Sequence, residues 1–341
     1  MKEEKNMANG KTTDGLMRHI RDSHNIEIRG SSEKKKLTAM GYFHGYKAYR
    51  FNKDIQHMFT LDNFKQIIAI NTFDEQMKAC FYPLTMKFEA LLKNYLIEQT
   101  VAYQECSYEY IYNQKLIEYR SYAPNTPQFK NAVKKRLSLK KSLDSAVAYD
   151  YQNDNSLIKH YIENNKPIPL WAIFETISLG LVGSFAASLN KQDRINIAQK
   201  LHVYDPNNDV AAKILQQSIY TIKDLRNSIA HNKVIFDCRF SSQHQVSNNV
   251  KRLIRRKLRI PEQTQIDFST LFYYFALLII FIKESGASKT ELKRYIASFS
   301  STTNNLKNCI SDTNINFPQV VYNQIVGTGI TGKIDLLKSY I

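Results

Sequence analysis

Long apolar runs are scarce in this sequence, and the longest, Leu271–Ile282, has 12 residues. A helix needs about 20 apolar residues to cross a membrane, so this run predicts a buried helix and disfavours an integral membrane protein. The N-terminal segment also lacks the apolar core of a secretory signal peptide. We therefore expect a cytoplasmic protein, for which association with a membrane surface stays open.

Cysteine is equally sparse. The four cysteines, Cys80, Cys106, Cys238 and Cys309, lie far apart and form no CxxC pair, which is typical of reduced thiols in a cytosolic protein. None of the eight histidines is spaced with Cys, Asp or Glu as a metal site requires. The chain also has no P-loop, no GxGxxG and no locally supported Ser-His-Asp arrangement. We expect no metal and no cofactor.

Acidic residues are outnumbered by basic ones. The sequence has 47 Lys and Arg against 31 Asp and Glu, which gives a formal net charge of +16, and its pI is near 9.5. This charge favours a polyanionic partner, either nucleic acid or an anionic membrane surface. The 21 tyrosines and 18 phenylalanines suit base stacking as well as core filling.

Apolar residues recur at intervals of three and four in several segments of the chain, which predicts helices there. Residues 1–15 are polar and charged, and we expect a disordered tail there, followed by a small helical lobe over residues 16–60. The strongest periodicity covers residues 61–99, where Pro83 should kink the helix or begin a new one. We assign residues 61–240 to a helical core and residues 241–341 to a basic helical region packed on it.

The segment of greatest chemical interest is Asp224–His231, which reads DLRNSIAH. On a helical wheel Arg226 falls inside an apolar stripe, where a guanidinium is costly unless it is paired. His231 has the side chain best suited to proton transfer near neutral pH, and Asn227 directly follows the arginine. A structural reading is also open, in which Arg226 bridges to a carboxylate of another helix and His231 caps or packs a helix end. The stripe consists of Ile214, Leu215, Ile219, Ile222, Leu225 and Ile229.

An acidic residue in a second apolar segment offers a partner for Arg226. Residues 170–189 read as one helix, and Glu175 lies on its apolar face. We therefore expect the two helices to pack together and Glu175 to pair with or orient Arg226, with Glu89 as a second candidate. Small residues on the opposite face would let another helix approach closely, and these are Gly180, Gly183 and Ala187.

Basic side chains gather in three further places. The first, around residues 34–50, is interleaved with aromatics; the second lies on a predicted exposed helix near residue 135. The third, residues 251–259, has arginines on a face about 100° wide that could track a phosphate backbone. Structural interpretations are open too. Charge runs could simply form a surface that contacts solvent, and the basic and aromatic residues of the first group could belong to a small helical lobe packed through its aromatic side chains. The candidate RNA-binding residues are Lys34, Lys35, Lys36, Lys47, Arg50, Lys134, Lys135, Arg136, Arg252, Arg255, Arg256 and Arg259.

Four passages, in order, resemble the bacterial Abi-like abortive-infection proteins, the AbiD/AbiF group: GYFHGYKAYRF, FDEQMKACFYPLTMKFEALLKNYL, WAIFETISLGLVGSF and LRNSIAHNKVIF. The resemblance covers about residues 35 to 240. It implies an all-α HEPN-type bundle, frequent homodimerisation and the R-polar-xxx-H ribonuclease motif, which falls on Arg226, Asn227 and His231. It also implies a toxin-like role in phage defence, in which RNA cleavage or translational arrest stops growth, and a structured noncoding RNA as a partner.

These expectations combine into a metal-independent endoribonuclease. A ribose 2′-hydroxyl would attack the adjacent phosphate while His231 moves a proton and Arg226 stabilises the phosphate charge, so that a 2′,3′-cyclic phosphate forms and DNA is not cleaved. On a regular helix Arg226 and His231 point about 140° apart. They could meet if the helix unwinds near Asn232 or if two chains share their motifs. The alternatives are a non-catalytic RNA-binding protein and a membrane-surface protein that binds through residues 251–259.

Overall fold

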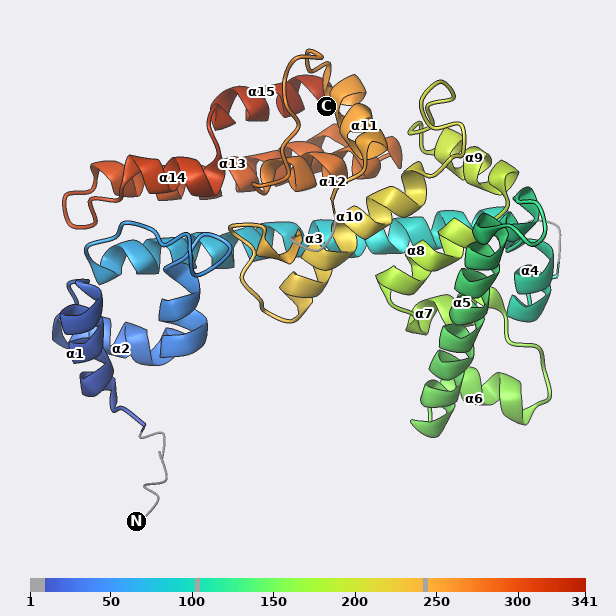
Figure 1. Cartoon of the computed structure of the whole chain (residues 1–341), viewed down its shortest axis with the longest axis horizontal. Helices are drawn as coiled ribbons and strands as arrows, with labels where there is room; N and C mark the ends of the chain where they lie inside the picture. The colour runs from blue at the N-terminus through green and yellow to red at the C-terminus, as the bar shows by residue number, and fades with distance from the viewer. Residues whose placement is uncertain (1–9, 102–104, 242–244) are drawn as a thin grey trace, which may run out of the picture.

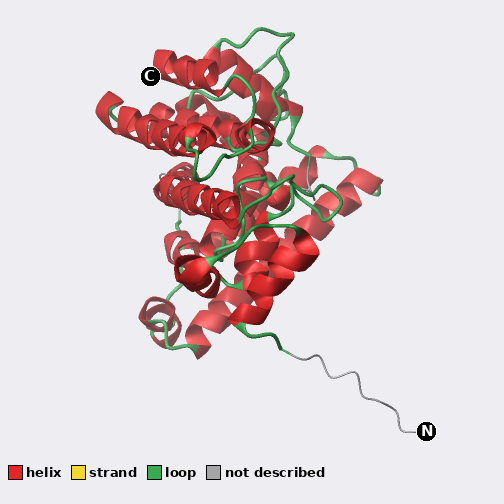
Figure 2. Ribbon diagram, turned by 90° about the vertical axis from the view of Figure 1, so that its left-hand side faces the viewer, coloured by secondary structure: helices red, strands yellow, loops and turns green. Residues whose placement is uncertain are grey.

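In the computed structural model, residues 10–101, 105–241 and 245–341 are described. They form α-helices joined by loops, with no strand among them, which confirms the all-α prediction (Figure 2). The helices are α1 (Thr13–His24), α2 (Gly30–Met40), α3 (Phe64–Val101), α4 (Tyr108–Gln114), α5 (Pro127–Gln152), α6 (Ser156–Glu163), α7 (Leu170–Thr176), α8 (Leu179–Ser188), α9 (Lys191–Lys200), α10 (Ile214–Ala230), α11 (Asn248–Leu258), α12 (Phe272–Glu284), α13 (Lys289–Ser311), α14 (Gln319–Val326) and α15 (Ile330–Tyr340). The shorter turns are the π-helix η1 (Tyr42–Tyr46) and the 3-10 helices η2 (Lys47–Tyr49), η3 (Glu118–Ser121) and η4 (Arg239–Ser241).

Helix α3 is the longest helix of the described chain, and several other helices pack along it. Its 38 residues span about 57 Å at 1.5 Å per residue, with α1 and α2 near one end and α4 to α7 near the other (Figure 1). Pro83 lies inside α3, and no new helix begins there. A proline removes one backbone hydrogen bond, but Phe81, Leu84 and Phe88 beside it are fully buried. Their packing holds the helix together across the missing bond.

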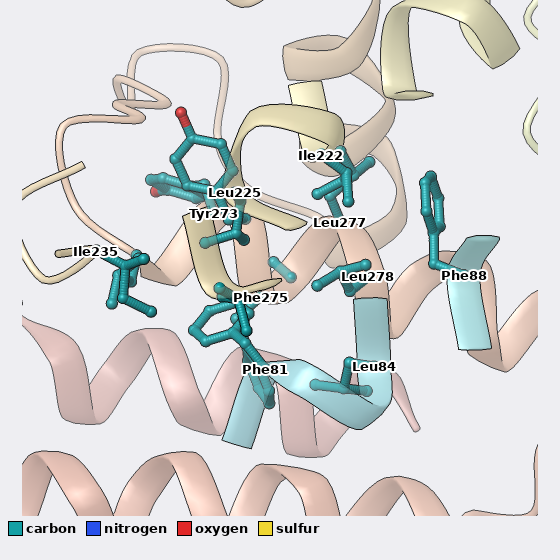
Figure 3. Close-up of a cluster of buried hydrophobic side chains, with 14 of the residues drawn as sticks. Phe81, Leu84, Phe88, Ile222, Leu225, Ile235, Tyr273, Phe275, Leu277 and Leu278 are labelled. Carbon is teal, nitrogen blue, oxygen red and sulfur yellow. The ribbon is translucent and has the colours of Figure 1, made fainter. Parts of the chain in front are cut away.

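The core forms where α3, α10 and α12 meet (Figure 3). The rings of Phe81 and Phe275 meet edge to face with centroids 5.8 Å apart, and those of Phe88 and Phe281 do so at 5.2 Å. Every residue from Phe272 to Ile282 in α12 is buried, as expected for a helix that is apolar on all sides. Within the described parts of the chain, no helix is long and apolar enough to cross a membrane.

The first helix begins earlier than the sequence suggested. Residues 1–9 lie outside the described residues, but α1 already begins at Thr13. The hydroxyl of Thr12 accepts a hydrogen bond from the backbone N–H of Gly15 at 3.2 Å and so caps the helix. The expectation of disorder up to residue 15 was therefore wrong for its last residues.

Residues 170–189 form two helices, where we expected one. Helix α7 ends at Thr176, Ile177 is extended, and the Ser178 side chain caps α8 by accepting from the N–H of Leu181. The expected close approach does occur at Gly183, where an added Cβ would lie 2.8 Å from the Tyr220 ring and 2.9 Å from Ile219. The glycine therefore lets α8 pack tightly on α10.

Candidate functional site

Helix α10 carries the DLRNSIAH segment, and its orientation follows from its apolar stripe. All six predicted stripe residues, from Ile214 to Ile229, are at most 8% exposed. They pack into the core beside α3 and α12, with Ile222 and Leu225 among them (Figure 3). Burial of this stripe fixes the rotation of α10 and so decides where Arg226, Asn227 and His231 emerge.

Arg226 is held by α3 through an ion pair. Its Nε donates to Oε2 of Glu89 at 2.9 Å, and the two side chains are 24% and 10% exposed. Lys93, one turn further along α3, also pairs with Glu89 at 3.1 Å. A second guanidinium nitrogen of Arg226 donates to the Asn227 side-chain oxygen at 3.3 Å. The guanidinium is thus paired, as its place beside an apolar stripe requires.

The partner of Arg226 is therefore Glu89, the second candidate, and the assignment to Glu175 was wrong. Glu175 is exposed on α7. The helical wheel that placed it on an apolar face assumed an unbroken helix over residues 170–189, and the break at Ile177 and Ser178 removes that phase relation.

His231 stands where α10 ends. Its backbone N–H still bonds to the carbonyl of Asn227 at 3.0 Å, but Asn232 takes a left-handed conformation with φ 49°. The N–H of Lys233 then turns back to the carbonyl of Ser228 at 2.7 Å, which terminates the helix. The His231 side chain is exposed.

A buried carboxylate on α3 anchors the chain that follows His231. Asp74 is fully buried, and its Oδ1 accepts from the backbone N–H groups of Ile235 and Phe236 at 2.8 Å each. Its Oδ2 accepts from the Tyr49 hydroxyl at 2.9 Å and pairs with Lys78 at 2.8 Å. Burial, aided by the nearby charge of Asp74, raises the pKa of Tyr49 well above its usual value, so the hydroxyl keeps its proton and donates it.

The side chains of Asn227 and His231 border a cleft of about 940 Å³, here called the histidine cleft. Residues from the segment 39–49 line it as well, including His44 on η1. Glu75 and Lys78 of α3 and Lys233 also line it. Lys78 is fixed by Asp74 and by a hydrogen bond to the side-chain oxygen of Asn232 at 3.0 Å. The cleft thus combines imidazole, amide and ammonium groups with the carboxylates of Glu75 and Asp224. The imidazole, amide and ammonium groups can together bind a phosphate and move a proton.

Sequence reasoning did not single out His44, Lys78 or Lys233. His44 lies in the passage GYFHGYKAYRF, so the residue was visible, but nothing in its spacing pointed toward His231. Its position depends on Gly45, where an added Cβ would lie 2.3 Å from the carbonyl oxygen of Met40. Only glycine fits this close approach of η1 to the end of α2.

Arg226 is not among the residues that line the histidine cleft. The chain therefore places Asn227 and His231 in one cleft and directs Arg226 toward Glu89. The helix does end beside Asn232, as one of the two expected routes required, but this does not bring Arg226 into the cleft.

Four of the candidate RNA-binding arginines are engaged within the fold. Arg50 is only 9% exposed and stacks on the rings of Tyr46 and Phe51. Arg136 lies over the Tyr112 ring at 3.8 Å and donates to two backbone carbonyls. Arg255 donates to the carbonyl of Thr264, and Arg256 to those of Val203 and Tyr204. These guanidinium groups hold segments of the protein together, which the charge pattern alone does not reveal.

The remaining candidates differ in their setting. Lys34 pairs with Asp14 at 2.6 Å, and Lys36 is partly buried. Exposed positions are held by Lys35 on α2, Lys47 on η2, Arg252 on α11 and Arg259 at the C-terminal cap of α11. Lys134 and Lys135 are exposed on α5 and line a second cleft of about 670 Å³ between η3, α5, α8 and α10, here called the basic cleft. The structure does not bring the predicted basic residues together into one surface.

No group of three or more His, Cys, Asp or Glu side chains in the described parts of the chain is placed to hold a metal ion. In comparisons with known proteins, a family model described as Abi-like protein matches residues 35–237. The match covers the second half of α2 and all of α3 to α10. It therefore includes every residue that lines the basic cleft, and all of those that line the histidine cleft except Arg239 and Phe240. No curated protein and no solved structure matches the chain.

Proposed function

Because this chain belongs to the Abi-like protein family, which suggests abortive-infection phage defence, we propose that it defends the cell by cleaving RNA in the histidine cleft. The observation that carries this proposal is the setting of His231. Its imidazole is exposed in a cleft that also presents Asn227, Lys78 and Lys233. An imidazole beside amide and ammonium donors is suited to phosphoryl transfer near neutral pH.

The reaction needs no group from outside the protein and RNA. The ribose 2′-oxygen forms a bond to the adjacent phosphorus while the bond from phosphorus to the 5′-oxygen breaks. His231 takes the proton from the 2′-hydroxyl and passes it to the departing 5′-oxygen. The Asn227 amide and Lys233 ammonium stabilise the charge on the phosphate oxygens. The products are a 2′,3′-cyclic phosphate and a 5′-hydroxyl, and DNA, which lacks the 2′-hydroxyl, is not a substrate.

Arg226 enters this reaction from a second copy of the chain. Within one chain it pairs with Glu89 outside the cleft. A homodimer that brings Arg226 of one protomer to the histidine cleft of its partner would complete the R-polar-xxx-H motif that the HEPN resemblance implies. Such a shared site requires both surfaces to be self-complementary about a twofold axis.

Replacing His231 tests the proposal directly. We expect His231→Ala to lower RNA cleavage by at least about a hundredfold, the usual effect of losing a general acid or base, while folding and RNA binding persist. Mass spectrometry of the products should detect cyclic phosphate ends, and a chelator should not stop the reaction. His160, exposed on α6 and outside the histidine cleft, is the matched control, and His160→Ala should cleave at the wild-type rate. Cleavage unchanged in His231→Ala would rule this mechanism out.

The second candidate function is a non-catalytic protein that holds a structured noncoding RNA. The ion pair between Arg226 and Glu89 favours it, because a paired arginine needs no substrate to explain it. Sequencing RNA that copurifies from the native host separates the two. Cyclic phosphate ends that disappear in His231→Ala support the enzyme, and an intact structured RNA that is the same with both proteins supports the binding protein.

A further inference from the structure

One side of α10 borders three hollows in succession. Lys213, at the start of the helix, and Tyr220 line the basic cleft. Tyr220 and Asp224 line a middle hollow of about 320 Å³. Asp224 and His231 line the histidine cleft. Each hollow therefore adjoins the next across a side chain that both share, and together they follow the whole length of α10.

The first of these hollows is positively charged. Lys134 and Lys135 of α5 and Lys213 line it, and within the described chain none of these three ammonium groups forms an ion pair. Among its described lining residues the one carboxylate is Glu118, which pairs with the buried Arg194 at 2.8 Å. The lysine charges are therefore uncompensated, as a site for phosphate groups requires.

Tyrosine rings stand among these lysines. Tyr119, Tyr122 and Tyr220 line the basic cleft and are partly exposed. Arg136 lies 5.2 Å from the Tyr119 ring and is itself bound to two backbone carbonyls, so it holds that ring in place. Aromatic rings beside cations are the features that bind unpaired bases together with their phosphates.

We infer that α10 is the floor of a track for single-stranded RNA, with the basic cleft binding nucleotides several positions away from the phosphate that is cut beside His231. This inference rests on the proposed function for the cutting step only. The 17 residues of α10 span about 25 Å, which corresponds to at most about seven nucleotides at the ~3.4 Å spacing of a fully stacked strand, and to fewer where the strand is extended. The bases must be unpaired to stack on the tyrosines.

The first test measures binding without cleavage. Full-length His231→Ala protein is titrated against a labelled single-stranded RNA of about ten nucleotides, which covers the ~25 Å track, and binding is followed by fluorescence anisotropy. Adding Lys134→Glu and Lys135→Glu to this protein should raise Kd by at least about tenfold. The matched control is Lys130→Glu with Lys141→Glu, which makes the same charge change at exposed residues of α5 outside the basic cleft. Equal weakening by both pairs would mean general charge attraction and would overturn the inference.

A second variant separates stacking from charge. Tyr122→Ala should weaken binding of the single strand by about fivefold to a hundredfold, the usual effect of losing one stacked base, and should have a smaller effect on a hairpin of the same base composition, whose bases are paired. Circular dichroism and the unfolding midpoint confirm that the variant is folded. A folded Tyr122→Ala protein that binds the single strand as tightly as its parent would contradict the track.

The last measurement distinguishes failure of the track from failure of the proposed function. With His231 intact, an RNA of about ten nucleotides should have a lower KM than a dinucleotide, because only the longer RNA reaches the basic cleft. Lys134→Glu with Lys135→Glu should shrink this difference, and the Lys130 and Lys141 control pair should keep it. Cleavage without any length preference overturns the track and leaves the function standing. Lysine-dependent binding with no cleavage of any RNA overturns the proposed function and leaves the track standing.

Discussion

At the scale of single residues, one ion pair decides what Arg226 can do. Its guanidinium lies beside the apolar stripe of α10 and is neutralised by Glu89, which Lys93 contacts from the other side. Losing one partner of a mostly buried pair leaves the other charge without compensation, which costs more than the pair itself contributes. Glu89 is therefore a positioning residue, because it fixes the direction of Arg226 and touches no substrate in the proposed reaction.

Neutralising Glu89 should cost both stability and activity. We expect Glu89→Gln to lower the free energy of unfolding by about 1–3 kcal/mol, less than for a fully buried pair because Arg226 stays partly in contact with solvent. RNA cleavage should fall as well, because Arg226 loses its orientation. Urea unfolding and a cleavage assay measure the two effects. Glu175→Gln removes a charge of the same kind at an exposed residue of α7 and should change neither. If the two variants behave alike, the Glu89 pair has no special role.

The sequence led to the right residue types here but to the wrong partner. The apolar stripe of α10 was predictable because six residues share one helical phase, and all six are buried. The helical phase that relates Glu175 to the rest of residues 170–189 was not predictable, because two extended residues, Ile177 and Ser178, reset it. A serine that can cap a helix, Ser178, was the available signal for that break.

At the scale of elements, the contact between α8 and α10 sets the shape of the basic cleft. Gly183 lets the two helices approach so closely that an added Cβ would lie 2.8 Å from Tyr220 and 2.9 Å from Ile219. Tyr220 also lines the basic cleft and the middle hollow. The glycine therefore affects the position of the Tyr220 ring as well as the packing density between the two helices.

Two glycines on α8 allow a matched test of this contact. An alanine at Gly183 would bring its Cβ within 2.8 Å of the Tyr220 ring, whereas the nearest atom at Gly180 is 3.7 Å away. Both substitutions gain about 1 kcal/mol of helix propensity, but Gly183→Ala also overpacks the contact by about 1–3 kcal/mol. We expect Gly183→Ala to unfold at a lower urea concentration than Gly180→Ala. Equal midpoints would show that α10 can move away from α8 without cost.

At the scale of the whole molecule, the histidine cleft depends on contacts between distant segments. Its walls come from residues 39–49, from α3 and from the end of α10, and Asp74 ties these parts together through Tyr49, Ile235 and Phe236. Periodicity could predict the helices and the buried α12, since both follow from local spacing. It could not predict that His44 and His231 would share a cleft, because that depends on how α3 positions segments far apart in sequence.

Within one chain, His231 lies in the histidine cleft whereas Arg226 pairs with Glu89 outside it. This separation leads to a test of the proposed dimer. If each active site combines Arg226 of one chain with His231 of the other, an Arg226→Ala chain and a His231→Ala chain form a heterodimer with one intact site and one doubly altered site. Each variant alone should be inactive. After equal amounts are mixed and allowed to exchange, half the dimers are mixed, so about a quarter of the wild-type cleavage rate should return.

Two further observations make this result specific to a shared site. The cleavage activity recovered on mixing should rise with the fraction of mixed dimers, which native mass spectrometry of differently tagged chains measures. It should vanish on dilution below the dissociation constant of the dimer. A chain carrying both substitutions, mixed with either single variant, should restore nothing, since no intact pair of Arg226 and His231 can form across the interface. Full activity of a strictly monomeric protein, or mixed dimers without activity, would place the whole reaction within one chain. Arg226 would then have to leave Glu89 and reach the histidine cleft of its own chain.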